Sequence, residues 1–122
     1  MSRFVLLLRG GSEEIRAYSP EQFQDMLTSY STWIDHLRAT GKYQIGEPLQ
    51  NDGRLLRPNG QGIVEGPYTE TKEAVGGFVI VEAGDYDEAV QIAHGCPRLT
   101  HGGFIEVREI ADELSHAAHA GA

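Results

Sequence analysis

The sequence predicts an α+β fold in which two helices lie on one face of a mainly antiparallel sheet. Three observations support this prediction: strand and helix patterns alternate along the chain, the chain has 122 residues, and 40% of them are hydrophobic. That length suits one domain, and that hydrophobic fraction is enough for a core without disulfides or a metal. We expect one domain over residues 1–112 and a flexible C-terminal tail over residues 113–122.

The first strand and the first helix have the clearest signals. Residues 4–8 form an unbroken apolar run, which is typical of a covered strand, and residues 9–18 are expected to form a loop. Ser19 is a good N-cap and Pro20 suits the first helical position, so a helix is expected to begin there and to end at Gly41. One face of this helix collects apolar residues at helical spacing: Phe23, Met26, Leu27, Tyr30, Trp33, Ile34 and Leu37.

The middle of the chain predicts an edge strand and short strand pieces. Residues 42–50 have strand character, and Pro48 places this strand at or near a sheet edge. The Asn-Asp-Gly run at residues 51–53 is a hairpin-turn signal. Residues 54–58 and 62–64 are expected to be short strand pieces with a turn between them.

The last third of the chain completes the plan. Residues 76–82 predict a buried strand, and Asp85 predicts the cap of a helix that has Glu88 at its third position and ends near His94. Residues 102–110 predict the last strand. The order βαββαβ with an extra hairpin is the ferredoxin-like plan. If the uncovered face of such a sheet is apolar, a second copy of the chain is its simplest cover.

Charge and cysteine content narrow the classes of partner. The formal net charge of −8 argues against direct nucleic-acid binding, which needs a basic patch, and against binding to an anionic membrane surface. The first apolar run is too short for a signal peptide or a membrane span. The single cysteine, Cys96, excludes an intrachain disulfide and is compatible with a cytoplasmic location.

The stretch "VEGPYTETKEAVGGFVIV", residues 64–81, joins a polar loop to a glycine pair and a strand. The loop is either a solvated turn or a binding segment in which Lys72, between Glu70 and Glu73, binds an anionic group. A pair of glycines within a strand, Gly76 and Gly77, indicates a bulge or the close approach of another backbone or a ligand. Both interpretations of the loop stay open.

This stretch also carries a resemblance to a known family. The residues Glu65-Gly66-Pro67-Tyr68, Glu70-Thr71-Lys72-Glu73 and Gly76-Gly77-Phe78 are similar to the motif of the DGPF branch of the YCII-related family. The resemblance runs from Phe4 to about Ile110. It implies a ferredoxin-like subunit that forms a homodimer of the dimeric α/β-barrel kind, in which two sheets can enclose a cleft.

The resemblance also bears on chemistry. Some members of the wider family carry a histidine and an aspartate in the cleft, and at least one relative removes halide from a chlorinated muconate-type compound. The matching positions here hold Tyr30 and Cys96. Some DGPF-type proteins are encoded with extracytoplasmic-function sigma factors, which implies a regulatory setting.

Several other side chains are candidate site residues. Tyr30 is either a core residue or a hydrogen-bond donor in the cleft. His94, Cys96 and His101 are zinc-ligand types, but their spacing matches no zinc motif, so no metal and no cofactor are predicted.

The first functional prediction is a small homodimer that binds an anionic small molecule, with Tyr30, Glu70, Lys72, Glu73 and His94 as candidate binding residues. No catalytic residue is assigned. One alternative is a lyase or isomerase acting on a small organic acid, with Tyr30 or His94 moving the proton. The other alternative is an interaction module in sigma-factor-linked regulation, with a regulatory protein as partner.

Overall fold

The computed structural model describes residues 1–56, 58, 63–65 and 74–120. Its elements follow one another as β1 (Ser2–Gly10), α1 (Ser12–Arg16), α2 (Pro20–Ala39), β2 (Tyr43–Pro48), β3 (Arg54–Leu56), β4 (Ile63–Glu65), β5 (Val75–Ala83), α3 (Tyr86–His94), the 3-10 turn η1 (Pro97–Thr100), β6 (Gly103–Glu109) and α4 (Asp112–Ala120). The fold is α+β, as the sequence predicts. No helix within these residues is both long enough and apolar enough to cross a membrane.

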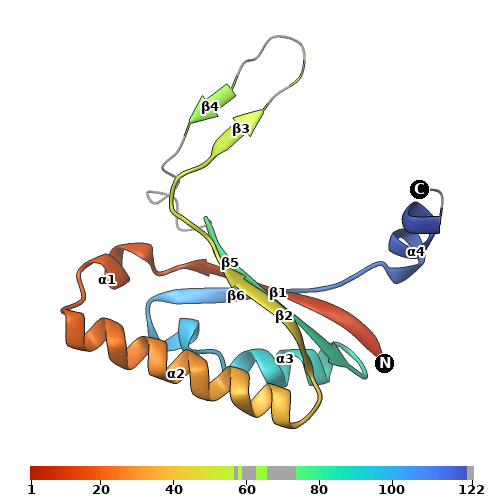
Figure 1. Ribbon diagram of the computed structural model, residues 1–122, viewed down its shortest axis with the longest axis horizontal. Coiled ribbons are helices and arrows are strands. Elements are labelled where there is room, and N and C mark those ends of the chain that lie inside the picture. The colour runs from red at the N-terminus through yellow and green to blue at the C-terminus, as the bar shows by residue number, and fades with distance from the viewer. Residues whose placement is uncertain (57, 59–62, 66–73, 121–122) are drawn as a thin grey trace.

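The main sheet has four strands in the order β2-β5-β1-β6, and every neighbouring pair is antiparallel. The two long strands β1 and β5 lie at its centre, and β2 forms one edge, as Pro48 predicts. This is the ferredoxin-like arrangement, with β3 and β4 as an added two-stranded hairpin. Figure 1 shows α2 and α3 on the same side of the sheet, while the hairpin projects away from it.

The core lies between α2, α3 and one face of the sheet. Alternate residues of the central strands point to this face, so Phe4, Leu6 and Leu8 of β1 are buried together with Val79 and Val81 of β5. From the helices, Trp33, Leu37, Ala89 and Ala93 complete the cluster. The indole N–H of Trp33 donates to the carbonyl of Ile92 at 3.2 Å, which ties α2 to α3.

Both predicted helix starts are present. The hydroxyl of Ser19 accepts from the backbone N–H of Gln22 at 3.1 Å, and the Gln22 side chain accepts from the N–H of Ser19 at 2.8 Å. This is a complete capping box, with Pro20 at the first position of α2. At α3, the carboxylate of Asp85 accepts from the N–H of Glu88 at 2.9 Å.

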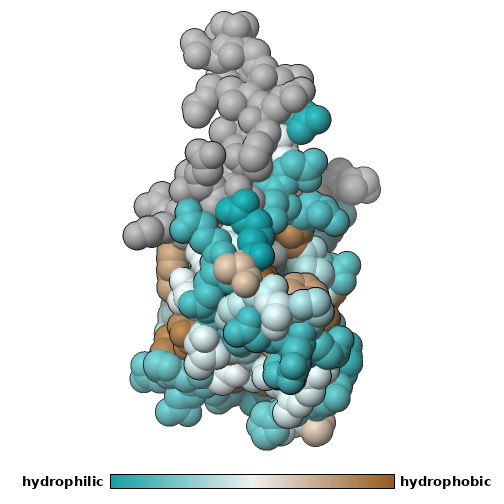
Figure 2. Space-filling model, turned by 90° about the vertical axis from the view of Figure 1, so that its left-hand side faces the viewer, coloured by the Kyte–Doolittle hydropathy of each residue, from teal (hydrophilic) through white to brown (hydrophobic). Residues whose placement is uncertain are grey.

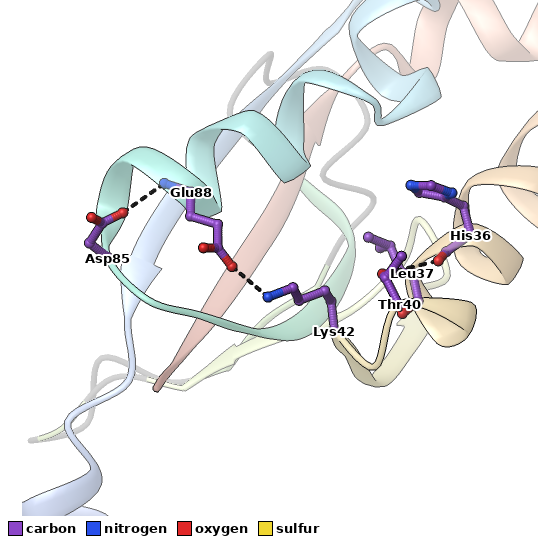
Figure 3. Close-up of polar contacts among 6 residues, drawn as sticks. All are labelled: His36, Leu37, Thr40, Lys42, Asp85 and Glu88. Atoms are coloured by element: carbon purple, nitrogen blue, oxygen red, sulfur yellow. Dashed lines mark hydrogen bonds and ion pairs between the residues drawn. The ribbon is translucent and has the colours of Figure 1, made fainter.

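An ion pair ties the end of α2 to the start of α3. The ammonium of Lys42, the residue before β2, lies 2.7 Å from a carboxylate oxygen of Glu88 in α3, and Figure 3 shows the two side chains pointing toward each other. In the same view, the hydroxyl of Thr40 bonds back to carbonyls of the last turn of α2. These contacts fix the corner at which the chain leaves α2 for the sheet.

Two local expectations are wrong. The loop over residues 9–18 contains a short helix, α1, because Gly11 at φ 80° turns the chain after β1 and serves as the N-cap of α1, and two glutamates favour the first helical turn. The Asn-Asp-Gly run does not turn a hairpin between β2 and β3, because β2 pairs with β5 and β3 pairs with β4. The pairing of each strand with a distant partner, not the local turn signal, determines how β2 and β3 are connected.

The sequence predicts a flexible C-terminal tail over residues 113–122. Residues Asp112–Ala120 form the helix α4, and the flexibility of this segment stays a prediction. Three alanines and the acidic first turn at Asp112 and Glu113 favour a helix there. Arg3 holds its start by donating to Asp112 at 2.9 Å, and the rest of α4 projects from the sheet (Figure 1).

The second face of the sheet is covered by neither α2 nor α3. Val5 pairs with Ile80, which pairs with Ile45, and Leu7 pairs with Phe78. These residues alternate with the buried ones, so they lie on the opposite face, where they form an apolar patch bordered by Glu47, Glu106 and Arg108. We call these five residues the outer apolar face. An apolar sheet face of this kind commonly marks an interface.

Candidate functional site

A cavity of about 460 Å³ lies within the chain, between the N-terminal half of α2 and the edge of the sheet at β2. Its walls come from β1, α1, α2, β2, β5 and η1. The residues that line it are Leu8, Ser12, Ile15, Arg16, Phe23, Met26, Leu27, Tyr30, Ile34, Tyr43, Gly46, Glu47, Pro48, Leu49, Asn51, Gly76, Gly77, Phe78, Val79 and Arg98. This volume is in the range of pockets that hold small organic ligands.

One wall of the cavity is the apolar stripe of α2. Phe23, Met26, Leu27 and Tyr30 follow one another at helical spacing and all line the cavity. Further along the helix, Trp33 and Leu37 pack into the core instead. Phe23 is 43% exposed and Leu27 is 41% exposed, so this half of the stripe lacks the cover that the other half has. Figure 2 views this end of the molecule, where hydrophobic patches lie among hydrophilic residues.

Arg98 is the most unusual residue of the cavity. It is 8% exposed and is the only charged residue that the described part of the chain buries to this extent. It lies in η1, which begins at Pro97, and the N–H of Leu99 donates to the carbonyl of Cys96 at 3.2 Å. This tight turn directs the Arg98 side chain back under the sheet.

Two glycines make room for Arg98. A Cβ atom on Gly76 would overlap Nη2 of the guanidinium and lie 3.2 Å from Cζ. A Cβ atom on Gly103 would lie 2.7 Å from Cγ and 2.8 Å from Cδ of the same side chain. Glycine at both positions therefore lets the strands β5 and β6 approach the arginine closely.

The guanidinium is not neutralised within the described residues. None of their carboxylates forms an ion pair with Arg98, and its Nε is buried with no hydrogen-bond partner among them. An arginine keeps its charge at every physiological pH, and a buried charge without a counterion is costly. An anion beside the guanidinium would supply the missing counterion.

Tyr30 and Cys96 lie beside Arg98. The Tyr30 hydroxyl is buried and has no hydrogen-bond partner in the part of the chain that the structure describes. Burial, followed by the nearby Cys96 thiol, raises the pKa of Tyr30 above its ordinary value, and Arg98 partly offsets that rise. Burial also raises the pKa of the Cys96 thiol to about 11, again against the influence of Arg98.

These pKa shifts define the chemistry at this end of the cavity. At neutral pH Tyr30 and Cys96 both keep their protons. Burial raises the pKa of each group, and the opposing effect of the Arg98 charge is smaller. The site therefore presents one fixed positive charge and a neutral hydroxyl. Such a pair can donate hydrogen bonds to an anion, whereas neither Tyr30 nor Cys96 is prepared to remove a proton.

The linker between α1 and α2 is tied down next to the cavity. The hydroxyl of Tyr18 donates to the carboxylate of Glu14 at 2.7 Å and also meets Nδ1 of His101. His101 follows η1 directly, so these contacts connect α1, which lines the cavity, to the turn that carries Arg98.

The predicted site residues fall into three groups. Tyr30, Gly76 and Gly77 line the cavity. His94 is exposed in the last turn of α3 and does not line the cavity. Glu65 closes β4, and the remaining predicted residues of the loop lie outside the described residues: Gly66, Pro67, Tyr68, Glu70, Thr71, Lys72 and Glu73.

Arg98 is the site residue that the sequence did not indicate. In the sequence it stands in a turn after Pro97, where an arginine is ordinarily exposed. The only available signal was indirect: two glycines, Gly76 and Gly103, occur within strands, and each indicates close approach of another group. No group of three or more metal-ligand side chains gathers within residues 1–56, 58, 63–65 and 74–120.

The comparison with protein-family models decides the family. The model of the YCII-related domain matches residues 3–113. The chain belongs to the YCII-related family. That match covers almost the whole main sheet and all the elements that form the cavity. A comparison with curated proteins gave no match.

Family membership confirms the resemblance drawn from the sequence, and the ferredoxin-like sheet agrees with it. The assignment of this YCII-related protein to the DGPF branch stays a prediction. The predicted cleft between two sheets also stays a prediction. The cavity described above lies within one chain and is built without a second copy.

Proposed function

We propose that this YCII-related protein binds a small anionic molecule in the cavity that holds Arg98. The observation that carries the proposal is the buried guanidinium, which lines a cavity of about 460 Å³ and has no carboxylate partner among the described residues. An arginine fork offers a fixed pair of N–H donors, which suits the two oxygens of a carboxylate or a phosphate. The ligand would neutralise the charge that the fold leaves unpaired.

This proposal moves the anion-binding role from Lys72 to Arg98. The sequence favoured Lys72 because it stands between two glutamates in a loop, but that loop lies outside the described residues. Arg98 has a cavity, two glycines that accommodate it and a neighbouring buried hydroxyl at Tyr30. Lys72 remains a candidate for a second contact, which a Lys72→Ala variant would test in the same assay.

The test is anion binding by wild type and two matched variants. Calorimetry or thermal shift would use benzoate, acetate, inorganic phosphate and sulfate as probes. Arg98→Met removes the charge and keeps an apolar side chain of similar reach, while Arg108→Met removes an arginine from the exposed part of β6. We expect binding in wild type and Arg108→Met and none in Arg98→Met. Absence of binding to every probe, or binding that survives in Arg98→Met, would contradict the proposal.

We further propose that the protein is a homodimer that pairs through the outer apolar face. This face presents Val5, Leu7, Ile45, Phe78 and Ile80 without a covering helix. Ile45 lies on the edge strand and is exposed, and covering these side chains would be favourable at about 25 cal/mol for each Å² of apolar surface removed from water. The symmetric solution is a second copy of the same face.

Light scattering after gel filtration tests the dimer. We expect wild type to have twice the mass of the chain at micromolar concentration, and Ile80→Lys to be monomeric. Leu99→Lys is the control, since Leu99 is an exposed apolar residue on the opposite side, in η1. A monomeric wild type would rule out this interface.

The two alternatives from the sequence receive less support. A lyase or isomerase was predicted to use Tyr30 or His94 to move the proton, and burial raises the pKa of Tyr30, so its hydroxyl keeps its proton at neutral pH. His94, the other proposed acid or base, does not line the cavity. No observation in the described residues points to a regulatory protein as partner.

A further inference from the structure

The charges around the cavity limit the charge of its ligand. Among the described residues, three charged ones line it: Arg16, Glu47 and Arg98. Arg16 and Glu47 are exposed, so water screens them, and only Arg98 is buried. One buried positive charge balances one negative charge, whereas a second negative charge in the same cavity would be desolvated without a counterion. The cavity therefore suits a monoanion better than a dianion.

The hydrogen-bonding groups at the buried end match a carboxylate. Nε of Arg98 and the hydroxyl of Tyr30 are the two buried side-chain polar atoms that find no partner within the described residues. They belong to neighbouring side chains that both line the cavity. A carboxylate has two oxygens, so one can meet the guanidinium and the other can accept from the hydroxyl.

The walls indicate the rest of the ligand. Between the buried end and solvent the cavity is lined by large apolar side chains, among them Ile15, Phe23, Met26 and Leu27. Phe23 and Leu27 leave more than two-fifths of their surface exposed. An apolar ligand body would cover them, whereas the hydroxyl groups of a sugar would lose hydrogen bonds to water against these walls.

We propose that the ligand is a monocarboxylic acid with an apolar body, such as an arylalkanoic or medium-chain alkanoic acid. Its carboxylate lies against Arg98 and Tyr30, and its body lies along the α2 stripe formed by Phe23, Met26 and Leu27. This inference rests on the proposed anion-binding function and adds the chemical class. It requires affinity to rise with the apolar size of the acid.

The experiment is a titration series followed by calorimetry. The acids would be acetate, butyrate, hexanoate, benzoate and phenylacetate, and the comparison probes would be succinate, inorganic phosphate, glucose 6-phosphate and the uncharged amide hexanamide. Each methylene that becomes buried should tighten binding about fourfold. We expect hexanoate and phenylacetate to bind at least tenfold tighter than acetate, and the dianions and hexanamide to bind weakly.

A matched pair of leucine variants tests the wall without touching the charge. Leu27 lines the cavity and Leu99 does not, yet each is 41% exposed, so Leu27→Ala and Leu99→Ala remove the same atoms from surfaces of equal exposure. We expect Leu27→Ala to weaken hexanoate binding by about fivefold to tenfold and to leave acetate binding unchanged. Leu99→Ala should bind both acids as wild type does.

The outcomes separate the ligand class from the proposed function. Tighter binding of phosphate, succinate or glucose 6-phosphate than of hexanoate, lost in Arg98→Met, would overturn the ligand class and retain anion binding. Equal affinity for acetate and hexanoate would also overturn the ligand class while leaving the anion-binding proposal in place. Binding of hexanamide as tight as that of hexanoate, or no binding of any anion, would overturn both.

Discussion

The guanidinium of Arg98 fills the space that a side chain at position 76 would need, so Gly76 is a glycine because of an arginine twenty-two residues away in sequence. Gly103 limits the same side chain from β6, where an added Cβ would lie 2.7 Å from Cγ of Arg98. The end of Arg98 and its stem are thus each held against a strand. This arrangement positions the charge, because the side chain has little room to move away.

Gly76→Ala is expected to displace the guanidinium. The new methyl group would overlap Nη2 of Arg98. Because the aliphatic part of Arg98 packs against Gly103, the side chain has little room to shift, so the free energy of unfolding should fall by about 1 to 3 kcal/mol. Binding of benzoate or hexanoate should be lost as well. Urea denaturation and calorimetry would measure the two effects.

The control for this variant is Gly84→Ala. An added Cβ at Gly84 would lie 3.5 Å from a carboxylate oxygen of Glu88, an ordinary contact, so the change should stay within about 0.5 kcal/mol. In an Arg98→Ala background the overlap at position 76 disappears. Gly76→Ala should then cost little, and a loss of the same size in both backgrounds would show that Arg98 is not the cause.

Alkaline pH is expected to destabilise the protein through Cys96. Burial raises the pKa of the folded thiol from 9.0 to about 11, so between these values the folded state keeps a proton that the unfolded state has released. Stability from this group is complete below pH 9 and is lost as the pH rises through about 11. The contribution of this thiol to the fall in the free energy of unfolding cannot exceed about 1.4 kcal/mol per pH unit, the limit for one proton.

Urea denaturation of wild type and Cys96→Ala between pH 7 and pH 11 would measure this share. The variant should lose stability less steeply above pH 9, whatever its stability at neutral pH. Tyr30 is perturbed in the same direction, partly by the Cys96 thiol, so the difference between the two profiles includes the change that the variant makes in the pKa of Tyr30. Parallel pH profiles would mean that the thiol does not titrate as its burial implies.

The contrast between two leucines tests the core assignment. Leu37 is buried between α2 and the sheet, whereas Leu114 is exposed on α4. Leu37→Ala should lower the free energy of unfolding by about 2 to 5 kcal/mol, and Leu114→Ala should change it by less than about 0.5 kcal/mol. Chemical denaturation provides both values. A large loss at Leu114 would mean that α4 packs against another surface, such as a second copy.

The ion pair between Lys42 and Glu88 is expected to stabilise the corner shown in Figure 3. A double-mutant cycle with Lys42→Met and Glu88→Gln should give a coupling energy of about 0.2 to 1 kcal/mol, because both side chains are partly exposed. Raising the salt concentration to about 1 M should reduce it.

The pair Asp35 and Arg38 is the control for this cycle. Its atoms are 3.6 Å apart and both side chains are largely exposed, so its coupling should be smaller. A coupling at Lys42 and Glu88 no larger than this control would indicate that the contact follows from the fold and adds no stability.

Local sequence signals predicted the elements that depend on local physics. Ser19 and Gln22 specify the start of α2 through their own backbone, and Asp85 does the same for α3. The alternation of Phe4, Leu6 and Leu8 is enough to give β1 a buried face. The turn signal at residues 51–53 failed because strand pairing is decided by distant partners: β2 completes the sheet by pairing with β5.

The candidate site was predicted only in part for the same reason. Tyr30 was identified from its place on the α2 stripe, and Gly76 from its unusual place in a strand. Arg98 could not be identified, because its burial depends on β5 and β6 closing around a turn that looks exposed in the sequence.

The sequence by itself determined the α+β class, the starts of α2 and α3, the family and the apolar character of the central strands, since caps, periodicity and apolar runs act over a few residues. The tertiary structure decided which charge is buried and where the cavity lies. Desolvation of Arg98, the rise in the pKa of Tyr30 and Cys96 and the space left by Gly76 and Gly103 exist only when η1, α2 and the sheet come together. Burial is a property of packing between distant segments, and it is burial that distinguishes Arg98 from an ordinary surface arginine.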